Sequence, residues 1–173
     1  ADSETEGTSL VHTVTLSNAS ASSTTFAFSL SDVTTSGGDH GTPVFSAGVT
    51  DNGDGTITVD PGVTSFTVTV SSTNDTTDES DETYTLTVGG QSGTGTIVDN
   101  DAAPTISSVT ADSETEGTSL VHTVTLSNAS ASSTTFAFSL SDVTTSGGDH
   151  GTPVFSAGVT DNGDGTITVD PGV

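Results

Sequence analysis

Short runs in which apolar residues alternate with Ser, Thr or Ala recur along the chain about every ten residues. Phe26-Ala27-Phe28-Ser29-Leu30 is one such run, and Phe66-Thr67-Val68-Thr69-Val70 and Tyr84-Thr85-Leu86-Thr87-Val88 are others. A period of two places alternate side chains on opposite faces of a strand, and Thr and Val favour strands. No segment shows the period of an amphipathic helix. The pattern predicts an all-β protein of tandem antiparallel β-sandwich domains.

Glycine-rich and Asn- or Asp-containing segments separate these runs and predict turns. Asn52-Gly53-Asp54-Gly55 is typical of a hairpin turn, because Gly and Asn accept positive φ angles. Asp60-Pro61-Gly62 and Gly89-Gly90-Gln91-Ser92-Gly93 mark further turns. The strands expected between the turns lie near residues 9–16, 24–31, 43–49, 55–60, 64–71, 83–88 and 94–98.

The chain repeats itself. Residues 1–63 return unchanged as residues 111–173, so the period is the 110 residues that separate Ala1 from Ala111. A period of this length is a whole domain rather than a solenoid unit. The join at Asp99-Asn100-Asp101-Ala102-Ala103-Pro104 is short and has no flexible Gly/Ser run. We therefore expect residues 1–102 to form one domain that lacks its first strand, and residues 103–173 to begin an identical, incomplete one.

In the second copy, the run Thr105-Ile106-Ser107-Ser108-Val109 is expected to be the first strand. An unchanged tandem copy favours a structural array, in which the number of copies matters, over an enzyme. The sequence also shows no group of aromatic residues that would form a pocket, no cationic partner for an oxyanion and no nucleophile in a catalytic context, so we expect no enzymatic activity.

The charge of the chain has one sign. It contains no Lys or Arg but 23 Asp and Glu, for a net charge of -23. Carboxylates without cationic neighbours must repel each other, stay apart in water or bind cations from solution. Nucleic acids and anionic membranes are disfavoured as partners. Intrinsic disorder is the alternative that such a composition raises, but the alternating runs argue against it.

The acids gather in a few segments, which predicts cation binding. These segments are residues 2–7, Asp39, residues 74–82 and residues 99–101. Ca²⁺ suits such clusters because it takes six to eight oxygen ligands in flexible geometry, whereas Mg²⁺ prefers octahedral sites and Zn²⁺ prefers Cys and His. The segment Asp2-Ser3-Glu4-Thr5-Glu6-Gly7 is not an EF-hand, because its twelfth position is Thr13. The alternative is an acidic surface that only keeps the protein soluble.

Much of the period resembles the Calx-beta domain, a Ca²⁺-binding β-sandwich of immunoglobulin type. The resemblance is carried by Asp60-Pro61-Gly62, by Asp78-Glu79-Ser80-Asp81-Glu82-Thr83-Tyr84 and by Gly95-Thr96-Ile97-Val98-Asp99-Asn100-Asp101. Ser36-Gly37-Gly38-Asp39-His40 looks like the family's Gly-Ser-Asp-Tyr loop, and Glu6-Gly7 resembles its early Glu, although Glu4 is an alternative for that place.

Carried over by position, the resemblance implies a set of Ca²⁺ ligands. They are Glu6, Asp39, Asp75, Glu79, Glu82, Asp99 and Asp101, with Glu116 and Asp149 as counterparts in the second copy. Asn74 and Asn100 replace acids often found in the family, and His40 replaces its usual aromatic residue. Asp78 and Asp81 are expected to face solvent. His12 is in register with Leu10 and Val14, so we expect it to be partly buried in the sandwich.

The repetition, the acidity and the phrase Gly48-Val49-Thr50-Asp51-Asn52-Gly53-Asp54-Gly55-Thr56 also resemble the extender repeats of giant bacterial RTX adhesins. This resemblance implies a structural stalk repeat whose partners are the neighbouring identical domains of the same chain, in a monomeric rod stiffened by Ca²⁺. It implies an extracellular location on the Gram-negative outer membrane after type I secretion, and a role in cell adhesion and biofilm. The alternative function is a recognition module for carbohydrate, ice or a host protein, repeated for avidity; one Tyr and no Trp argue against a sugar-stacking site.

Overall fold

The computed structural model describes all residues, Ala1–Val173, and contains fourteen β-strands and no helix. No helix in it is therefore long and apolar enough to cross a membrane. The predicted all-β class is confirmed. Contacts divide the chain into two compact units: the first unit is Ala1–Asp75 with Ser80–Asn100, and the second unit is Thr76–Glu79 with Asp101–Val173.

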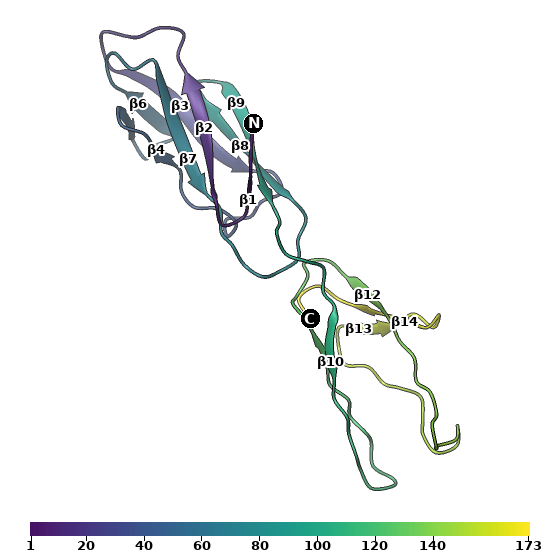
Figure 1. The fold of residues 1–173 in the computed structure, drawn as a ribbon. Coiled ribbons are helices and arrows are strands. Elements are labelled where there is room, and N and C mark those ends of the chain that lie inside the picture. Colours follow the sequence, from purple (N-terminus) through teal and green to yellow (C-terminus); the bar gives the residue numbers. More distant parts are fainter. The chain divides into compact units, whose positions relative to one another are not determined.

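The strands of the first unit are β1 (Asp2–Thr5), β2 (Ser9–Thr15), β3 (Thr24–Asp32), β4 (Val44–Phe45), β5 (Val49–Asp51), β6 (Thr56–Val59), β7 (Ser65–Ser71), β8 (Glu82–Val88) and β9 (Gln91–Val98). They form a six-stranded sheet in the order β1-β9-β8-β3-β6-β5 and a three-stranded sheet in the order β2-β7-β4 (Figure 1). Only β1, which pairs with β9, is parallel to its neighbour.

The inward residues of both sheets form the core of the first unit. One cluster joins Ile57 of β6, Val68 of β7 and Leu86 of β8, all at most 3% exposed. A second cluster contains Leu10, Val70, Tyr84 and Ile97. These apolar residues alternate with Thr and Ser along their strands, as the sequence pattern predicted, so the first unit is an antiparallel β-sandwich.

The predicted hairpin turn at residues 52–55 is confirmed. Gly53 and Gly55 have φ angles of 73° and 84°, values that a residue with a side chain rarely adopts. Asp54 supports the turn, because its Oδ1 accepts a hydrogen bond of 3.0 Å from the Thr56 N–H. The turn joins β5 to β6, which pair in register from Val49↔Val59 to Asp51↔Ile57.

Two features of the first unit differ from the expected strands. The single strand expected at 43–49 is two short strands in different sheets: β4 pairs with β7, and β5 pairs with β6. Gly48, with a φ angle of 85°, lies between them and lets the chain cross from one sheet to the other. β1 was not expected, because Asp2-Ser3-Glu4-Thr5 has no apolar alternation; it is an edge strand whose backbone pairs with β9.

The second unit has smaller sheets. β10 (Ile106–Val109) pairs with β11 (Val124–Leu126), and β12 (Thr134–Ala137), β14 (Thr166–Val169) and β13 (Val159–Asp161) form a three-stranded sheet. β10 confirms the strand expected at 105–109. Of residues 119–125, the equivalents of β2, only Val124 and Thr125 lie in a strand, β11. Leu120 is 54% exposed, whereas Leu10, its counterpart in the first copy, is 0% exposed.

Candidate metal centre

Three carboxylates meet where β1 and β9 end. The two strands run parallel with Thr5 opposite Val98, so Glu6 and Asp99 follow paired positions and leave the sheet at the same place. The Glu6 N–H donates to the Val98 carbonyl at 3.0 Å and continues the ladder by one residue. Asp101 follows two residues later. Carboxylate oxygens of Glu6, Asp99 and Asp101 lie within 4.8 Å of one another; we call these three residues the carboxylate cluster.

Asn100 and Gly7 allow the loop that contains Asn74 to lie against the carboxylate cluster. Asn100 Nδ2 donates to Asn74 Oδ1 at 3.2 Å and to the Glu6 carbonyl at 3.5 Å. Gly7 has a φ angle of 77°, and a Cβ at this position would lie 2.9 Å from Asn74 Cβ. Asn74 and Asn100, which the Calx-beta resemblance aligned with acids, thus bond to each other beside the cluster. A side chain at position 7 would push the Asn74 loop away.

The carboxylate cluster fits a hard divalent cation. Two ligand oxygens on one Ca²⁺ lie at most about twice 2.3–2.6 Å apart, or roughly 5 Å, and the separations in the cluster are within 4.8 Å. Glu6 is 8% exposed, and the atoms Glu6 Oε1 and Asp101 Oδ2 are completely buried. Burying ionised carboxylates is costly unless positive charge compensates them, and the chain has no Lys or Arg to do so.

Other predicted ligands lie outside this cluster. Asp75 is exposed, Glu79 is half-buried, and the half-buried Glu82 begins β8 opposite Ile97 of β9. Glu4, the alternative for the early Glu, is exposed on β1, two residues from the buried Glu6. Of the two glutamates, the structure therefore brings Glu6 into the cluster.

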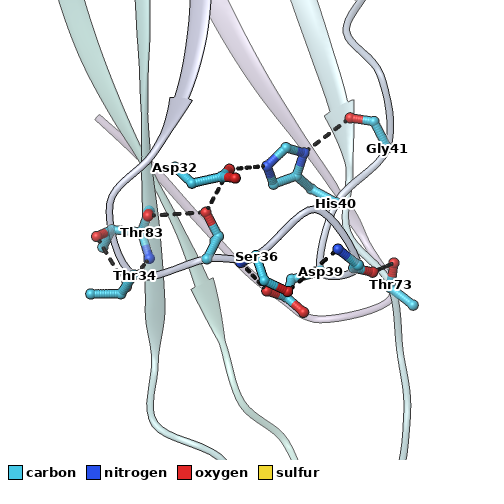
Figure 2. A network of polar contacts seen from close by, with 10 residues as sticks. Asp32, Thr34, Ser36, Asp39, His40, Gly41, Thr73 and Thr83 are labelled. Carbon is cyan, nitrogen blue, oxygen red and sulfur yellow. Dashed lines mark hydrogen bonds and ion pairs between the residues drawn. The ribbon is translucent and has the colours of Figure 1, made fainter.

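Asp39 organises its own loop. Its carboxylate accepts a hydrogen bond from the Ser36 N–H, and its carbonyl accepts one of 2.8 Å from the Thr73 N–H (Figure 2). Beside it, His40 Nε2 lies 2.7 Å from Asp32 Oδ1. The Asp39 side chain therefore closes its own loop and is not part of the carboxylate cluster, while the Asp39 carbonyl joins the loop to Thr73, two residues after β7.

The contact between His40 and Asp32 shifts the pKa of both side chains. Burial by itself lowers the pKa of His40, but its hydrogen bonds to Asp32 and to the Gly41 carbonyl, with the charges of Asp32 and Asp39, raise that pKa above its ordinary value. The hydrogen bonds from His40 and Thr35 lower the pKa of Asp32. A protonated His40 facing an ionised Asp32 is thus the favoured state over a wider pH range than for free imidazole.

The second copy shows which parts of the site are encoded locally. His150 Nε2 lies 2.8 Å from Asp142 Oδ1, and the Ser146 N–H donates to Asp149 Oδ2 at 2.7 Å, as in the first copy. Glu116, by contrast, is exposed where Glu6 is buried, and residues 112–115, the equivalents of β1, form no strand. The Asp39 loop forms from its own sequence, whereas the carboxylate cluster needs pairing between distant strands.

Two acids expected to face solvent make specific contacts. Asp81 is exposed as expected, and its Oδ1 accepts a 3.2 Å hydrogen bond from the Asp99 N–H, which helps to place Asp99. The expectation for Asp78 is wrong: this residue is half-buried, and its Oδ2 accepts a 2.7 Å hydrogen bond from Ser130 Oγ. A short acidic run carries no sign of which of its members will find a partner.

A buried polar pair lies in the second core cluster. His12, expected to be partly buried, is 7% exposed, and its Nε2 lies 2.8 Å from the Tyr84 hydroxyl. Burial lowers the pKa of His12, with the charge of Asp2 opposing the shift, and burial raises the pKa of Tyr84 to about 12. Gly95, opposite Tyr84, leaves room for the ring, because a Cβ there would lie 2.3 Å from Tyr84 Cζ. The alternation of His12 with Leu10 indicated its burial, but not its partner.

No protein family, no curated protein and no solved structure matches this chain.

Proposed function

We propose that each repeat is a structural Ca²⁺-binding extender of a long bacterial cell-surface adhesin, stiffened by Ca²⁺ at domain ends and linkers so that it projects a distal ligand-binding region. The observation that carries the proposal is the carboxylate cluster of Glu6, Asp99 and Asp101 in a chain without Lys or Arg. The unchanged duplication of residues 1–63 adds the second element, a unit used in series.

The position of the cluster suggests what the cation does. Glu6 follows the N-terminal edge strand β1, and Asp99 and Asp101 lie where the chain leaves β9. A Ca²⁺ held by all three would cancel their mutual repulsion and fasten the exit of the chain to the first strand. Three side chains supply part of the six to eight oxygens that Ca²⁺ takes, and backbone carbonyls and water would complete them. Binding to the folded state alone adds its free energy to stability.

Calorimetric titration with CaCl₂ tests the binding site. Glu6→Gln keeps the size of the side chain and removes one carboxylate of the cluster. Glu4→Gln removes the same charge two residues away, from an exposed position, and is the matched control. We expect Glu6→Gln to weaken Ca²⁺ binding about tenfold or more and Glu4→Gln to bind as the unchanged chain does. Equal Ca²⁺ affinity in both variants would remove the cluster from the proposal.

Small-angle scattering of chains with two, four and eight identical repeats tests the extender role. We expect the maximum dimension to increase in proportion to copy number in Ca²⁺, and to increase less steeply in EDTA. A maximum dimension that is the same in both conditions would contradict stiffening by Ca²⁺.

A recognition module is the second candidate, favoured by the polar face of the six-stranded sheet. Cross-strand rows there contain only Ser and Thr: Ser31, Thr85 and Thr94 form one row, and Ser29, Thr87 and Ser92 form the next. Such a regular hydroxyl surface could bind a carbohydrate or ice directly. Glycan-array binding and ice-growth assays on this chain separate the candidates, because specific binding of micromolar affinity would overturn the extender role in favour of recognition.

A further inference from the structure

Residues 19–21 and 129–131 have the same sequence, Ala-Ser-Ala, but different surroundings. In the second unit, Asp78 lies beside Ser130 as an isolated parallel β-bridge. The Asp78 N–H donates to the Ala129 carbonyl at 3.1 Å, and the Ala131 N–H donates to the Asp78 carbonyl at 2.9 Å. We call residues 76–79, which belong to this same compact unit, the donor segment, and residues 129–131 the acceptor segment.

A side-chain contact makes this bridge specific. Ser130 Oγ donates to Asp78 Oδ2 at 2.7 Å, so the acceptor segment recognises an acid as well as a backbone. Ser130 is 5% exposed in the bridge. A hydrogen bond to a charged partner in a buried position is stronger than one between neutral groups.

The same acceptor conformation is present in the first copy without a donor. The Gly62 N–H donates to the Ser20 carbonyl at 2.9 Å, and the equivalent bond from Gly172 to Ser130 is 3.0 Å. The Ser22 N–H donates to Ser20 Oγ at 3.1 Å, the same distance as in the second copy. The acceptor is therefore formed before anything pairs with it, which lowers the entropic cost of pairing.

What differs between the copies is exposure and hydrogen bonding. Ser20 is half-buried where Ser130 is buried, and Ala19 is exposed where Ala129 is half-buried. The Ala21 N–H has no partner within the protein, whereas the Ala131 N–H is bonded to Asp78. Residues 19–21 thus present the same groups to solvent that the donor segment covers in the second unit.

We propose that residues 19–21 are a docking site for a second copy of the donor segment Thr76-Thr77-Asp78-Glu79, supplied by another copy of this repeat. The occupant is identified by the bridge that this same segment makes on the identical sequence at 129–131. The region from Ser17 to Thr25 contains no acid, so an incoming acidic segment meets no carboxylate there. The bridge involves none of the carboxylate cluster, so the proposal does not depend on Ca²⁺ binding.

Amide hydrogen exchange in a lengthened chain tests the proposal. The chain is extended by one identical 110-residue period ahead of Ala1, with isotope labels confined to the original 173 residues by segmental ligation. In the original chain, the Ala131 N–H should exchange slowly and the Ala21 N–H rapidly. In the lengthened chain, we expect exchange at Ala21 to slow about fivefold or more, toward the rate at Ala131. An unchanged exchange rate at Ala21 would overturn the proposal.

A pair of identical substitutions supplies the control. Ser20→Ala and Ser130→Ala both remove the oxygen that accepts the N–H two residues later, but in the original chain only Ser130→Ala removes a bond to Asp78. We expect Ser130→Ala to speed exchange at Ala131 about fivefold and Ser20→Ala to leave exchange at Ala21 unchanged. In the lengthened chain, Ser20→Ala should speed exchange at Ala21 as well. Equal effects of the two substitutions on their own amides in the original chain would contradict the proposal.

The measurement is made in both Ca²⁺ and EDTA. The slowed exchange at Ala21 is expected in both conditions, since the docking contacts are hydrogen bonds from residues outside the carboxylate cluster. Loss of Ca²⁺ binding with retained protection at Ala21 would overturn the proposed cation site alone, and the reverse outcome would overturn the docking site alone.

Discussion

Neutralising Glu6 should make the first unit more stable without Ca²⁺, although the same change should weaken Ca²⁺ binding. The perturbation is Glu6→Gln, which keeps the shape of a buried side chain. In the absence of a cation, the Glu6 carboxylate lies near two others, with oxygens within 4.8 Å. Removing its charge removes two repulsive pairs at once.

The magnitude follows from these separations. At 4.8 Å, two unit charges repel by about 1 kcal/mol in a medium like bulk water and by about 3 kcal/mol at the effective dielectric constant typical of a protein surface. Two pairs at this longest separation therefore contribute about 2 kcal/mol in the first medium and about 7 kcal/mol in the second, and shorter separations contribute more. Glu6 is buried while Asp99 and Asp101 are half-buried, so the gain in the free energy of unfolding should be at least about 2 kcal/mol.

Urea unfolding in EDTA, followed by tyrosine fluorescence, measures the change. Tyr84 is the only tyrosine and the chain has no Trp, so the signal reports the first unit alone. Glu4→Gln is the control for net charge and should shift the free energy of unfolding by less than about 0.5 kcal/mol. A Glu6→Gln variant that is no more stable in EDTA than Glu4→Gln would refute the reasoning, because the three carboxylates would then not repel one another.

Two further predictions concern the surroundings of Tyr84 and the Asp39 loop. Gly95→Ala places a Cβ 2.3 Å from Tyr84 Cζ and should lower the free energy of unfolding in urea by about 3 kcal/mol. The control is Gly93→Ala, whose Cβ would have its nearest contact at 3.8 Å; it should leave the free energy of unfolding unchanged or raise it. Equal losses in the two variants would show that the Tyr84 ring has room to move. The pKa of His40 is raised in the folded state, so protonated His40 stabilises that state. This contribution to the free energy of unfolding is complete below about pH 6.5 and is lost as the pH rises through the raised pKa. His40→Asn should therefore cost more stability at pH 5.5 than at pH 8.5, and a loss that does not depend on pH would mean that the His40–Asp32 pair contributes no charge interaction.

The fold could be predicted from the sequence where strands carry their own apolar alternation. β3, β7 and β8 have such patterns, and the glycines of the β5–β6 turn mark its positive φ angles. β1 could not be predicted in this way, because an exposed edge strand needs only backbone groups to pair. Gly48 similarly divides a run that looks like one strand.

The candidate site was predictable in residue type but not in geometry. The acids and the missing cations indicate a cation site, but the choice between Glu4 and Glu6 depends on the parallel register that sets Thr5 opposite Val98. That register joins residues more than ninety positions apart, and no local pattern carries it. The contact of Asp78 with Ser130 is hidden for the same reason.

Calorimetric unfolding of this chain in saturating Ca²⁺ and in EDTA tests the central claim most directly. A cation at 100 times its dissociation constant adds about 2.7 kcal/mol to a folded state that binds it, and for a unit of about 100 residues this corresponds to a rise in Tm of roughly 10 °C or more. We predict such a rise for the first unit in Ca²⁺, and a smaller rise at the same concentration of Mg²⁺. A Tm for the first unit that is the same in Ca²⁺ and EDTA would contradict the account.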